Sequence, residues 1–447
     1  MMFFAHISYM YFVFILFPKR LRARHIKNIT YLHHALNKKD DGRITTMYSS
    51  VAEKNNTFDD ETTNTSTTTK NAFSLAEKKY RLKVIETIRV DAKTGRRRKS
   101  GKLVEEIDVS ETIDFDECVG HESSSAMRVS EVKEEEKKQT FKAKGGVEEV
   151  AAFSRFANAP SRERPRVWKL LDHPGAYYVQ NALDLREQRE LIMHCVKILP
   201  ERPNKTNHWQ RLGKPLPADL YRAAKAGLYL NEEENGWMEL EKPPKRGDGM
   251  ESRAARHLLR KLRWATVGAP FDWTKRVYEE ERAPEVDERI KRACVKTLEI
   301  VFGKEAAFVE KGEDKFFDGQ VGLANFYAPG DTLNGHVDDA EMNLSKPIAS
   351  LSLGLPAIFL LGQKSKALKP VTALIVRSGD AIVLSGESRT MFHGVPRVFS
   401  DGETLMSSSK TFRFPEALES AFDDDDDEFL LNFAKRTRIN LSLRDVR

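Results

Sequence analysis

The segment over residues 438–444 reads Arg-Ile-Asn-Leu-Ser-Leu-Arg, an alternation of polar and apolar side chains. In an extended strand, successive side chains point to opposite faces, so this pattern predicts one apolar face and one polar face. The polar face would carry Arg438, Asn440, Ser442 and Arg444. Buried guanidiniums need anionic partners, and arginine suits bidentate capture of carboxylates. The pattern therefore favours a small dianion bound inside a barrel, and a solvated edge strand is the alternative.

A candidate metal site lies about a hundred residues upstream of this segment. His336 and Asp338 are two positions apart, so on a strand both side chains project to one side. His393 can supply a third ligand from a distant strand. Two His and one carboxylate with open positions are the arrangement expected of a non-haem Fe(II) oxygenase. A His-x-Asp pair arises easily by chance, but its ordered combination with a later His and the arginine strand does not.

The surrounding sequence has the patterns of a β-rich fold. Residues 348–361 form a strongly apolar run, and the turn residues 378–380 lead into a short apolar strand over 381–384. Nearer the N-terminus we expect a strand over 176–180 and a helix over about 185–199.

Seven short motifs follow one another in order between residues 323 and 444. They are Leu323-x-Asn325-x-Tyr327, His336-x-Asp338-x-x-Glu341, Lys346-Pro347-Ile348, Ser352-Leu353-Gly354, Gly386-Glu387-Ser388-Arg389, His393-Gly394 and Arg438-x-Asn440-x-x-x-Arg444. Together they resemble the catalytic domain of the AlkB family of Fe(II)/2-oxoglutarate dioxygenases. Upstream pieces are similar to the first eukaryotic AlkB homologue subgroup, and these are Pro203–Asn207, Leu262–Gly268 and Phe271–Trp273. The resemblance covers roughly residues 165–447.

The fold that this resemblance implies is mainly β with flanking helices, an α+β arrangement built on a double-stranded β-helix, or jelly roll. An N-terminal nucleotide-recognition lid over the iron is expected from residues 204–273. We expect the dioxygenase domain to span residues 151–447 and residues 47–150 to be a largely disordered extension.

The resemblance also implies roles for individual residues. It makes His336, Asp338 and His393 the iron ligands and gives Arg438 the distal carboxylate of 2-oxoglutarate. The residues expected around the rest of the cosubstrate are Asn325, Tyr327, Asn440 and Arg444. With Fe(II), 2-oxoglutarate and O2, the implied reaction hydroxylates a C–H bond. On an N-methyl group it releases formaldehyde, together with succinate and CO2.

On the substrate side, Arg389 is expected to contact substrate or to shape the pocket. Trp264 and Trp209 are candidates for stacking a flipped base, and a place in the core is the alternative for each. Bacterial family members carry an acidic residue where this chain has Ala340, so a bacterial-style base contact is not expected. The neighbouring Glu341 is expected to be a solvated loop carboxylate.

Two functions share this core chemistry. The first is oxidative demethylation of N-methylated bases in nucleic acid, either 1-methyladenine in tRNA or alkylated DNA. The second is a protein-directed oxygenase that acts on histone lysine N-methyl groups. The intact ligand set argues against a catalytically silent binding module. We expect a monomer with no stable membrane partner.

Charge is unevenly distributed along the chain. The formal net charge is +6, but residues 1–39 hold seven Lys and Arg and no acid, which leaves the remainder close to neutral. Residues 1–46 therefore suit an organellar presequence or a signal anchor, or an over-extended start before Met47. The expected location is accordingly the nucleus and cytoplasm or the mitochondrion. Any contact with nucleic acid must come from local clusters, of which residues 253–263 are the best candidate, with a solvated helix face as the alternative.

Overall fold

The computed structural model describes residues 46–48, 71–90, 97–119, 147–150, 164–242, 244–245, 247–272, 275, 277–279, 283–303, 317–422 and 428–446. The predicted presequence 1–46, apart from Thr46, lies outside these residues, and so does Trp273. No helix in these ranges combines the length and apolarity needed to span a bilayer.

The chain forms two compact units. The first comprises residues 1–57 and 85–103, and the second comprises 58–84 and 104–447. A three-stranded sheet in the order β1-β2-β3 involves the first unit, with β1 (Thr46–Tyr48), β2 (Lys83–Val90) and β3 (Arg97–Glu105).

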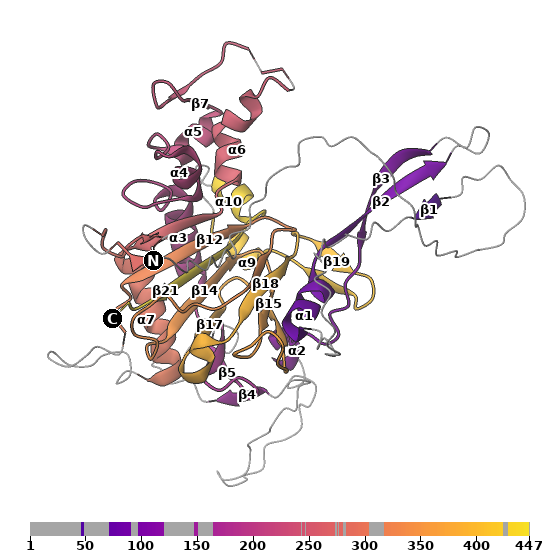
Figure 1. Cartoon of the computed structure of the whole chain (residues 1–447), viewed down its shortest axis with the longest axis vertical. Coiled ribbons are helices and arrows are strands. Elements are labelled where there is room, and N and C mark those ends of the chain that lie inside the picture. The colour runs from indigo at the N-terminus through magenta and orange to yellow at the C-terminus, as the bar shows by residue number, and fades with distance from the viewer. Residues whose placement is uncertain are drawn as a thin grey trace, which may run out of the picture. The chain divides into compact units, whose positions relative to one another are not determined.

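The second unit is built on an eight-stranded sheet in the order β4-β5-β6-β17-β14-β21-β12-β9, and every neighbouring pair is antiparallel (Figure 1). Its strands are β4 (Val147–Val150), β5 (Arg166–Leu170), β6 (Ala176–Gln180), β9 (Trp264–Gly268), β12 (Val321–Tyr327), β14 (Ile348–Gly354), β17 (Ala381–Leu384) and β21 (Arg438–Arg444). The predicted strands 176–180 and 381–384 are confirmed with these bounds.

A four-stranded antiparallel sheet in the order β13-β18-β15-β16 packs against the large sheet. Its strands are β13 (Leu333–His336), β15 (Ala357–Leu361), β16 (Thr372–Val376) and β18 (His393–Val398). One buried apolar cluster joins the inner faces of both sheets and includes Tyr178, Ile382, Phe359 and Val395. Two antiparallel sheets around a shared core form the jelly roll, so the predicted fold class is confirmed.

The predicted apolar run 348–361 crosses from one sheet to the other. It splits into β14 and β15 around Gly354, whose φ of +78° favours glycine. A Cβ at this position would lie 2.2 Å from the carbonyl oxygen of Thr437, so the close approach to the chain before β21 also requires glycine.

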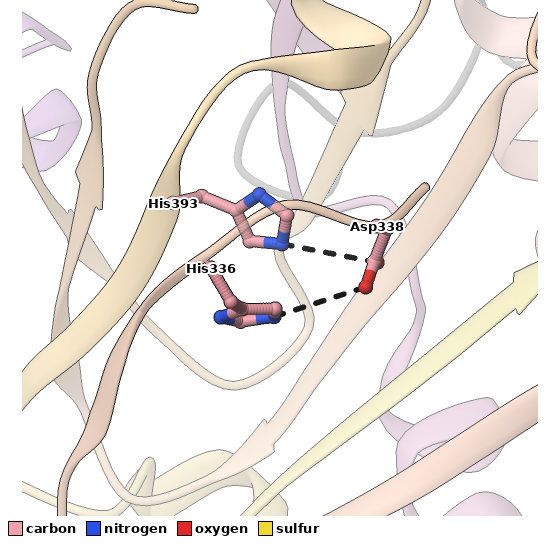
Figure 2. A group of neighbouring side chains, drawn as sticks. All are labelled: His336, Asp338 and His393. Atoms are coloured by element: carbon pink, nitrogen blue, oxygen red, sulfur yellow. Dashed lines mark ion pairs between the residues drawn. The ribbon is translucent and has the colours of Figure 1, made fainter. Parts of the chain in front are cut away.

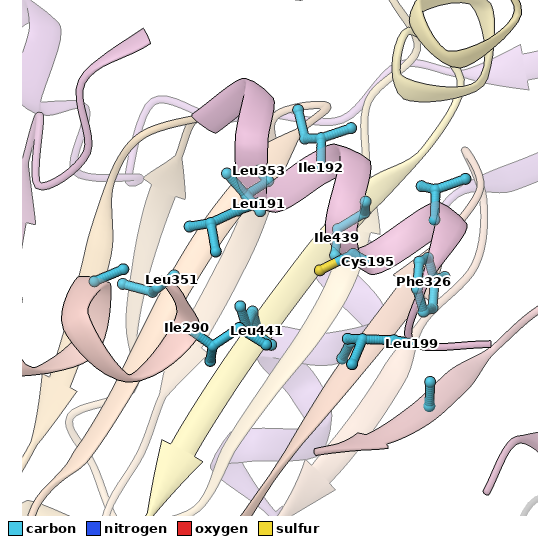
Figure 3. Close-up of a cluster of buried hydrophobic side chains, with 14 of the residues drawn as sticks. Leu191, Ile192, Cys195, Leu199, Ile290, Phe326, Leu351, Leu353, Ile439 and Leu441 are labelled. Carbon is cyan, nitrogen blue, oxygen red and sulfur yellow. The ribbon is translucent and has the colours of Figure 1, made fainter. Parts of the chain in front are cut away.

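The outer face of the large sheet is covered by two helices, α3 (Leu185–Lys197) and α7 (Glu288–Phe302) (Figure 3). Asp184 and Glu187 form a capping box that begins α3. Leu191 and Ile290 from these helices share a fully buried cluster with Leu441 and its neighbours on β21. The apolar face predicted for residues 438–444 is therefore confirmed as a core face.

The N-terminal extension differs from its expected disorder where the structure describes it. The helix α1 (Ala72–Tyr80) and residues 107–115 cover the outer face of the small sheet, where Phe73 and Ile107 share a cluster with Ile358 and Ile375. The short helix α2 (Phe115–Val119) follows. The segment folds because a few well-spaced apolar residues pack on a sheet face. Its average polarity gives no sign of these residues.

The expected lid segment forms small helices and hairpins before β9. They are α4 (Asn207–Leu212), α5 (Leu220–Ala226), β7 (Tyr229–Asn231), β8 (Gly236–Met238), the 3-10 helix η3 (Met250–Arg253) and α6 (Ala255–Arg260). After β9 come β10 (Phe271–Asp272) and β11 (Val277–Tyr278). Lys205 and Thr266 exchange backbone and side-chain hydrogen bonds, so two of the upstream motifs lie side by side. A lid role over the iron stays a prediction.

The remaining elements lie after β17. They are η4 (Gly386–Thr390), β19 (Glu403–Leu405), β20 (Lys410–Phe412), α9 (Glu416–Glu419) and α10 (Glu428–Ala434). The acidic run 423–428 lies outside the described residues except for Glu428.

The core face of β21 generates a stability prediction. Leu441→Ala should lower the free energy of unfolding by about 2–5 kcal/mol, because it leaves a cavity beneath α3 and α7. Leu441 is fully buried, whereas Leu368 is 53% exposed. Leu368→Ala is the matched control and should change stability by less than about 0.5 kcal/mol. Urea unfolding followed by circular dichroism measures both, and equal effects would contradict this placement of Leu441.

Candidate metal centre

The two candidate histidines face each other across a pair of strands. His336 ends β13, His393 begins β18, and the two are register partners with ring centroids 4.4 Å apart. Asp338 lies past the end of β13, so a loop rather than a strand brings it to the site. Its Oδ1 is 3.8 Å from Nε2 of His336 and its Oδ2 is 3.8 Å from Nε2 of His393 (Figure 2). The predicted ligands therefore converge, with their ligand atoms within 4.8 Å of one another.

Backbone carbonyls orient both imidazoles. Nδ1 of His336 donates to the carbonyl oxygen of Asn334 at 3.0 Å, and Nδ1 of His393 donates to that of Met391 at 3.1 Å. These bonds leave the two Nε2 atoms as the ligating atoms. Burial, and then the neighbouring His336, lower the pKa of His393 to about 4. The ring is therefore neutral at physiological pH, as metal binding requires.

Asp338 is held in its ionised form by arginine. Burial by itself would raise its pKa, but the Arg444 guanidinium and the two histidines bring the pKa well below its ordinary value. Nη1 of Arg444 lies 2.9 Å from Oδ2 of Asp338. A charged carboxylate beside two imidazoles is the donor set of a facial metal site, with further positions open to other ligands.

Glu341 is buried, which corrects its expected place as a solvated loop carboxylate. Its Oε1 accepts from the hydroxyl of Tyr278 at 2.7 Å, and its Oε2 accepts from Nη2 of Arg389 at 2.8 Å. Arg444 lies 3.4 Å from Oε1. These donors outweigh the effect of burial and lower the pKa of Glu341. One ionised carboxylate thus links two buried guanidiniums.

Arg389 holds the loop that carries Asp338, and a contact with substrate stays a prediction. It is 1% exposed, and besides Glu341 it donates to the carbonyl oxygens of Asp338, at 2.6 Å, and Lys346, at 3.0 Å. The alternative role of shaping the pocket fits this position. The sequence did not identify Glu341 as the partner of Arg389, because 48 residues separate the two in the chain.

Arg438, the other arginine of β21, lies in the interior with most of its donors unpaired. Arg438 is 1% exposed, and only its Nη2 is paired, at 3.1 Å from Oγ of Ser352. Its Nε and Nη1 are buried without hydrogen-bond partners among the described residues. Burial lowers its pKa to about 10. A bound carboxylate would supply the missing acceptors, so this cradle fits one end of the predicted dianion.

The other predicted dianion residues line the same inner face. Tyr327 is the register partner of Arg438, and Asn325 is that of Asn440. Asn440 donates to Oγ of Ser350 at 2.8 Å. Arg438 and Arg444 are six residues apart on β21, about 20 Å between Cα atoms at the usual strand rise. The two guanidiniums therefore approach the site from opposite ends, and Arg444 is at the metal end.

The two tryptophans predicted on the substrate side lie in different places. Trp264 is half-buried and is the register partner of Asn325, so it shares the face that carries the dianion residues. Trp209 is half-buried on α4. Base stacking by either residue stays a prediction. Tyr278, which sequence reasoning did not single out, reaches Glu341 from β11.

Comparison with known proteins gives consistent matches. The model of the 2OG-Fe(II) oxygenase superfamily matches residues 175–444. The DNA N(6)-methyladenine demethylase ALKBH1A of Arabidopsis thaliana is 33% identical, over 84% of this chain and 96% of its own length. The tRNA demethylase abh1 of Schizosaccharomyces pombe is 28% identical, over 64% of this chain and 83% of its own. The nucleic acid dioxygenase ALKBH1 of Homo sapiens is 28% identical, over 63% and 66%.

The unpaired guanidinium generates a binding prediction. Arg438→Ala should weaken 2-oxoglutarate binding about 10- to 100-fold, because a charge-assisted hydrogen bond contributes about 1.5–3 kcal/mol. Arg438→Lys should recover only part of the loss, since an ammonium does not reproduce the planar fork. Titration calorimetry with Mn(II) present measures the affinity.

A second buried arginine provides the control for this prediction. Arg397 is 2% exposed and packs against Phe399 on the outer face of the small sheet. Arg397→Ala should reduce stability and leave 2-oxoglutarate affinity unchanged. In the absence of cosubstrate, Arg438→Ala should not lower the melting temperature, because it removes an unpaired buried charge. Unchanged affinity in both Arg438 variants would contradict the assignment.

Proposed function

Because this chain belongs to the AlkB family of the 2OG-Fe(II) oxygenase superfamily, we propose that it oxidatively demethylates N-methylated bases in nucleic acid. Membership makes it an oxygenase and implies Fe(II), 2-oxoglutarate and O2. The observation that carries the proposal is one interior that holds both a His-Asp-His cluster and a buried guanidinium with two unpaired nitrogens.

The residues present fit these groups. Two imidazoles and an ionised carboxylate suit Fe(II), and the free donors of Arg438 suit the distal carboxylate of 2-oxoglutarate. When bound, iron with 2-oxoglutarate and O2 supplies the oxidising power to hydroxylate a substrate C–H bond. On an N-methyl group the product is a hemiaminal, which loses formaldehyde, and the cosubstrate leaves as succinate and CO2.

The chain's own residues hold this chemistry in position. His336, Asp338 and His393 would hold the metal on one side and leave the other side open. Arg444 keeps Asp338 ionised, while Arg389 fixes the loop backbone at Asp338. These contacts hold the metal ligands in place before substrate arrives. A rigid site of this kind favours reaction at one C–H bond over others.

The relatives' names support nucleic acid as the substrate class. One is named as a demethylase of DNA N(6)-methyladenine and another as a tRNA demethylase. Within this class we propose 1-methyladenine in tRNA as the first substrate to test, because the motifs at Pro203–Asn207 and Leu262–Gly268 are similar to the first eukaryotic AlkB homologue subgroup. The histone-lysine alternative has no supporting observation here and becomes an outcome of the test.

A direct assay tests the proposal. The full chain with Fe(II), 2-oxoglutarate and O2 should release formaldehyde from tRNA containing 1-methyladenine and convert that nucleoside to adenosine. Mass spectrometry of the digested RNA measures the loss, and DNA with N(6)-methyladenine and a trimethyl-lysine histone peptide are run in parallel. Asp338→Ala should abolish turnover, because two ligands do not retain the metal. Formaldehyde from the peptide and from neither nucleic acid would overturn the proposal.

In the structure, two arginines of the predicted basic cluster make contacts within the protein. In the predicted cluster 253–263, Arg256 donates to the carbonyl oxygens of Ala224 and Lys225, and Arg263 pairs with Asp331. These two arginines hold the scaffold together. Arg260 and Lys261, at the end of α6, are exposed to solvent.

A double substitution therefore tests the surface at the end of α6. Arg260→Ala with Lys261→Ala should weaken tRNA binding and reduce the slope of log affinity against log salt by up to about 2, since each phosphate contact contributes about 1. Arg186→Ala with Arg413→Ala is the control, because it removes the same charge from two other exposed positions. Fluorescence anisotropy across a salt series measures both. Equal slopes in the two double variants would show that this surface makes no contact with RNA.

A further inference from the structure

The helix α1 lies outside the residues that match the superfamily, yet it contacts the residue just before each candidate histidine ligand. We infer that α1 is a positioning element for the metal site. In this role Glu77 and Arg81 fix the chain before His336, and Phe73 fixes the chain before His393. The inference rests on the proposed metal site and is independent of the substrate.

Glu77 makes the most direct of these contacts. Its side chain is nearly buried, and its Oε1 accepts a hydrogen bond of 2.6 Å from the backbone N–H of Gly335, the residue before His336. The strand β13 is at the edge of its sheet, and its register with β18 shifts between Leu333 and His336. An irregular edge strand leaves backbone groups without ladder partners, so this carboxylate replaces a missing strand contact.

Arg81, the C-cap residue of α1, contacts Asn334, which precedes Gly335 in β13. Its Nη2 donates to Oδ1 of Asn334 at 2.9 Å. The carbonyl oxygen of the same Asn334 accepts from Nδ1 of His336 at 3.0 Å. The residue whose backbone orients the imidazole is therefore held through its side chain by the extension.

Phe73 acts on the other histidine strand through packing. Its ring is fully buried and lies 6.3 Å, centroid to centroid, from the ring of Phe392, the residue before His393. A Cβ on Gly335 would lie 2.3 Å from the Phe73 ring, and one on Gly362 would lie 2.6 Å from it. Both glycines thus let the ring lie directly against the backbone. Gly362 donates from its N–H to the carbonyl oxygen of Phe392 at 2.8 Å, which extends the contact to the second strand.

A purely structural role for α1 makes different predictions from a positioning role. As a cover for the small sheet, α1 would depend on Phe73 and Tyr80, and loss of Glu77 or Arg81 would change stability alone. As a positioning element, α1 fixes the ligands before metal arrives, and loss of such supporting contacts costs about 10- to 100-fold in metal affinity. Metal affinity therefore distinguishes the two roles.

The experiment measures Mn(II) binding to the full chain by titration calorimetry, without substrate. Glu77→Ala should weaken Mn(II) binding about tenfold or more, because the N–H of Gly335 loses its acceptor. Glu77→Gln keeps an oxygen in place and should recover most of the affinity. Arg81→Ala should weaken binding by a smaller factor, because that contact is exposed to solvent. Lys78→Ala is the matched control on the exposed side of the same helix and should bind like the parent.

Melting temperatures of the metal-free variants separate positioning from folding. A loss of affinity in Glu77→Ala that Glu77→Gln recovers, with folded protein in each case, supports the inference. Parent-like Mn(II) affinity in both Glu77→Ala and Arg81→Ala would overturn it. If Glu77→Ala does not fold, Arg81→Ala decides in the same way. A parent protein that binds Mn(II) and 2-oxoglutarate but demethylates no nucleic acid would remove the proposed function and leave this inference standing.

Discussion

The metal site depends on a balanced set of buried charges. Two carboxylates, Asp338 and Glu341, lie against two guanidiniums, Arg389 and Arg444, and the four charges cancel. Removing one member of such a group leaves an uncompensated charge in the interior, at a cost of about 3–5 kcal/mol. A carboxylate buried without its arginine would instead take up a proton and cease to be a good ligand. The charge network thus makes the ligand set available at neutral pH.

The two-sheet architecture determines where these charges can lie. The strand β21 is central in the large sheet, so one of its faces must meet helices and the other must meet the small sheet. Its apolar residues lie on the helix side, where α3 and α7 exclude water. The polar face is consequently turned toward the second sheet, and Arg438 remains there with unpaired donors. A protein that buries an unsatisfied guanidinium accepts a loss of stability, which a bound carboxylate restores.

Sequence reasoning brought the three candidate metal ligands together from short motifs and their order along the chain. Alternation along β21 does not depend on distant partners, whereas the strand expected to carry both His336 and Asp338 ends at His336 and a loop carries Asp338. The environment of Glu341 could not be predicted, because its partners come from three separate segments that only the fold brings together. The hydrogen bonds of Arg256 could not be predicted for a related reason, since the sequence of a short helix gives no sign of the carbonyl oxygens beside it. Low average hydrophobicity similarly concealed the few apolar residues that dock α1.

The strand that ends at His336 has few partners in its own sheet, and the helix α1 supplies further contacts to it. The candidate ligands include the last residue of β13, which is a short edge strand of the small sheet, and Asp338, which lies on the loop that follows. The charge network fixes the loop at Asp338 from the side of the large sheet, whereas the backbone preceding His336 is a separate segment. That backbone is held from the opposite side by Glu77 and Arg81. The charge network and α1 thus support His336 and Asp338 from two sides. Together they restrict the geometry of this pair more than either could alone, because each prevents movement in a different direction.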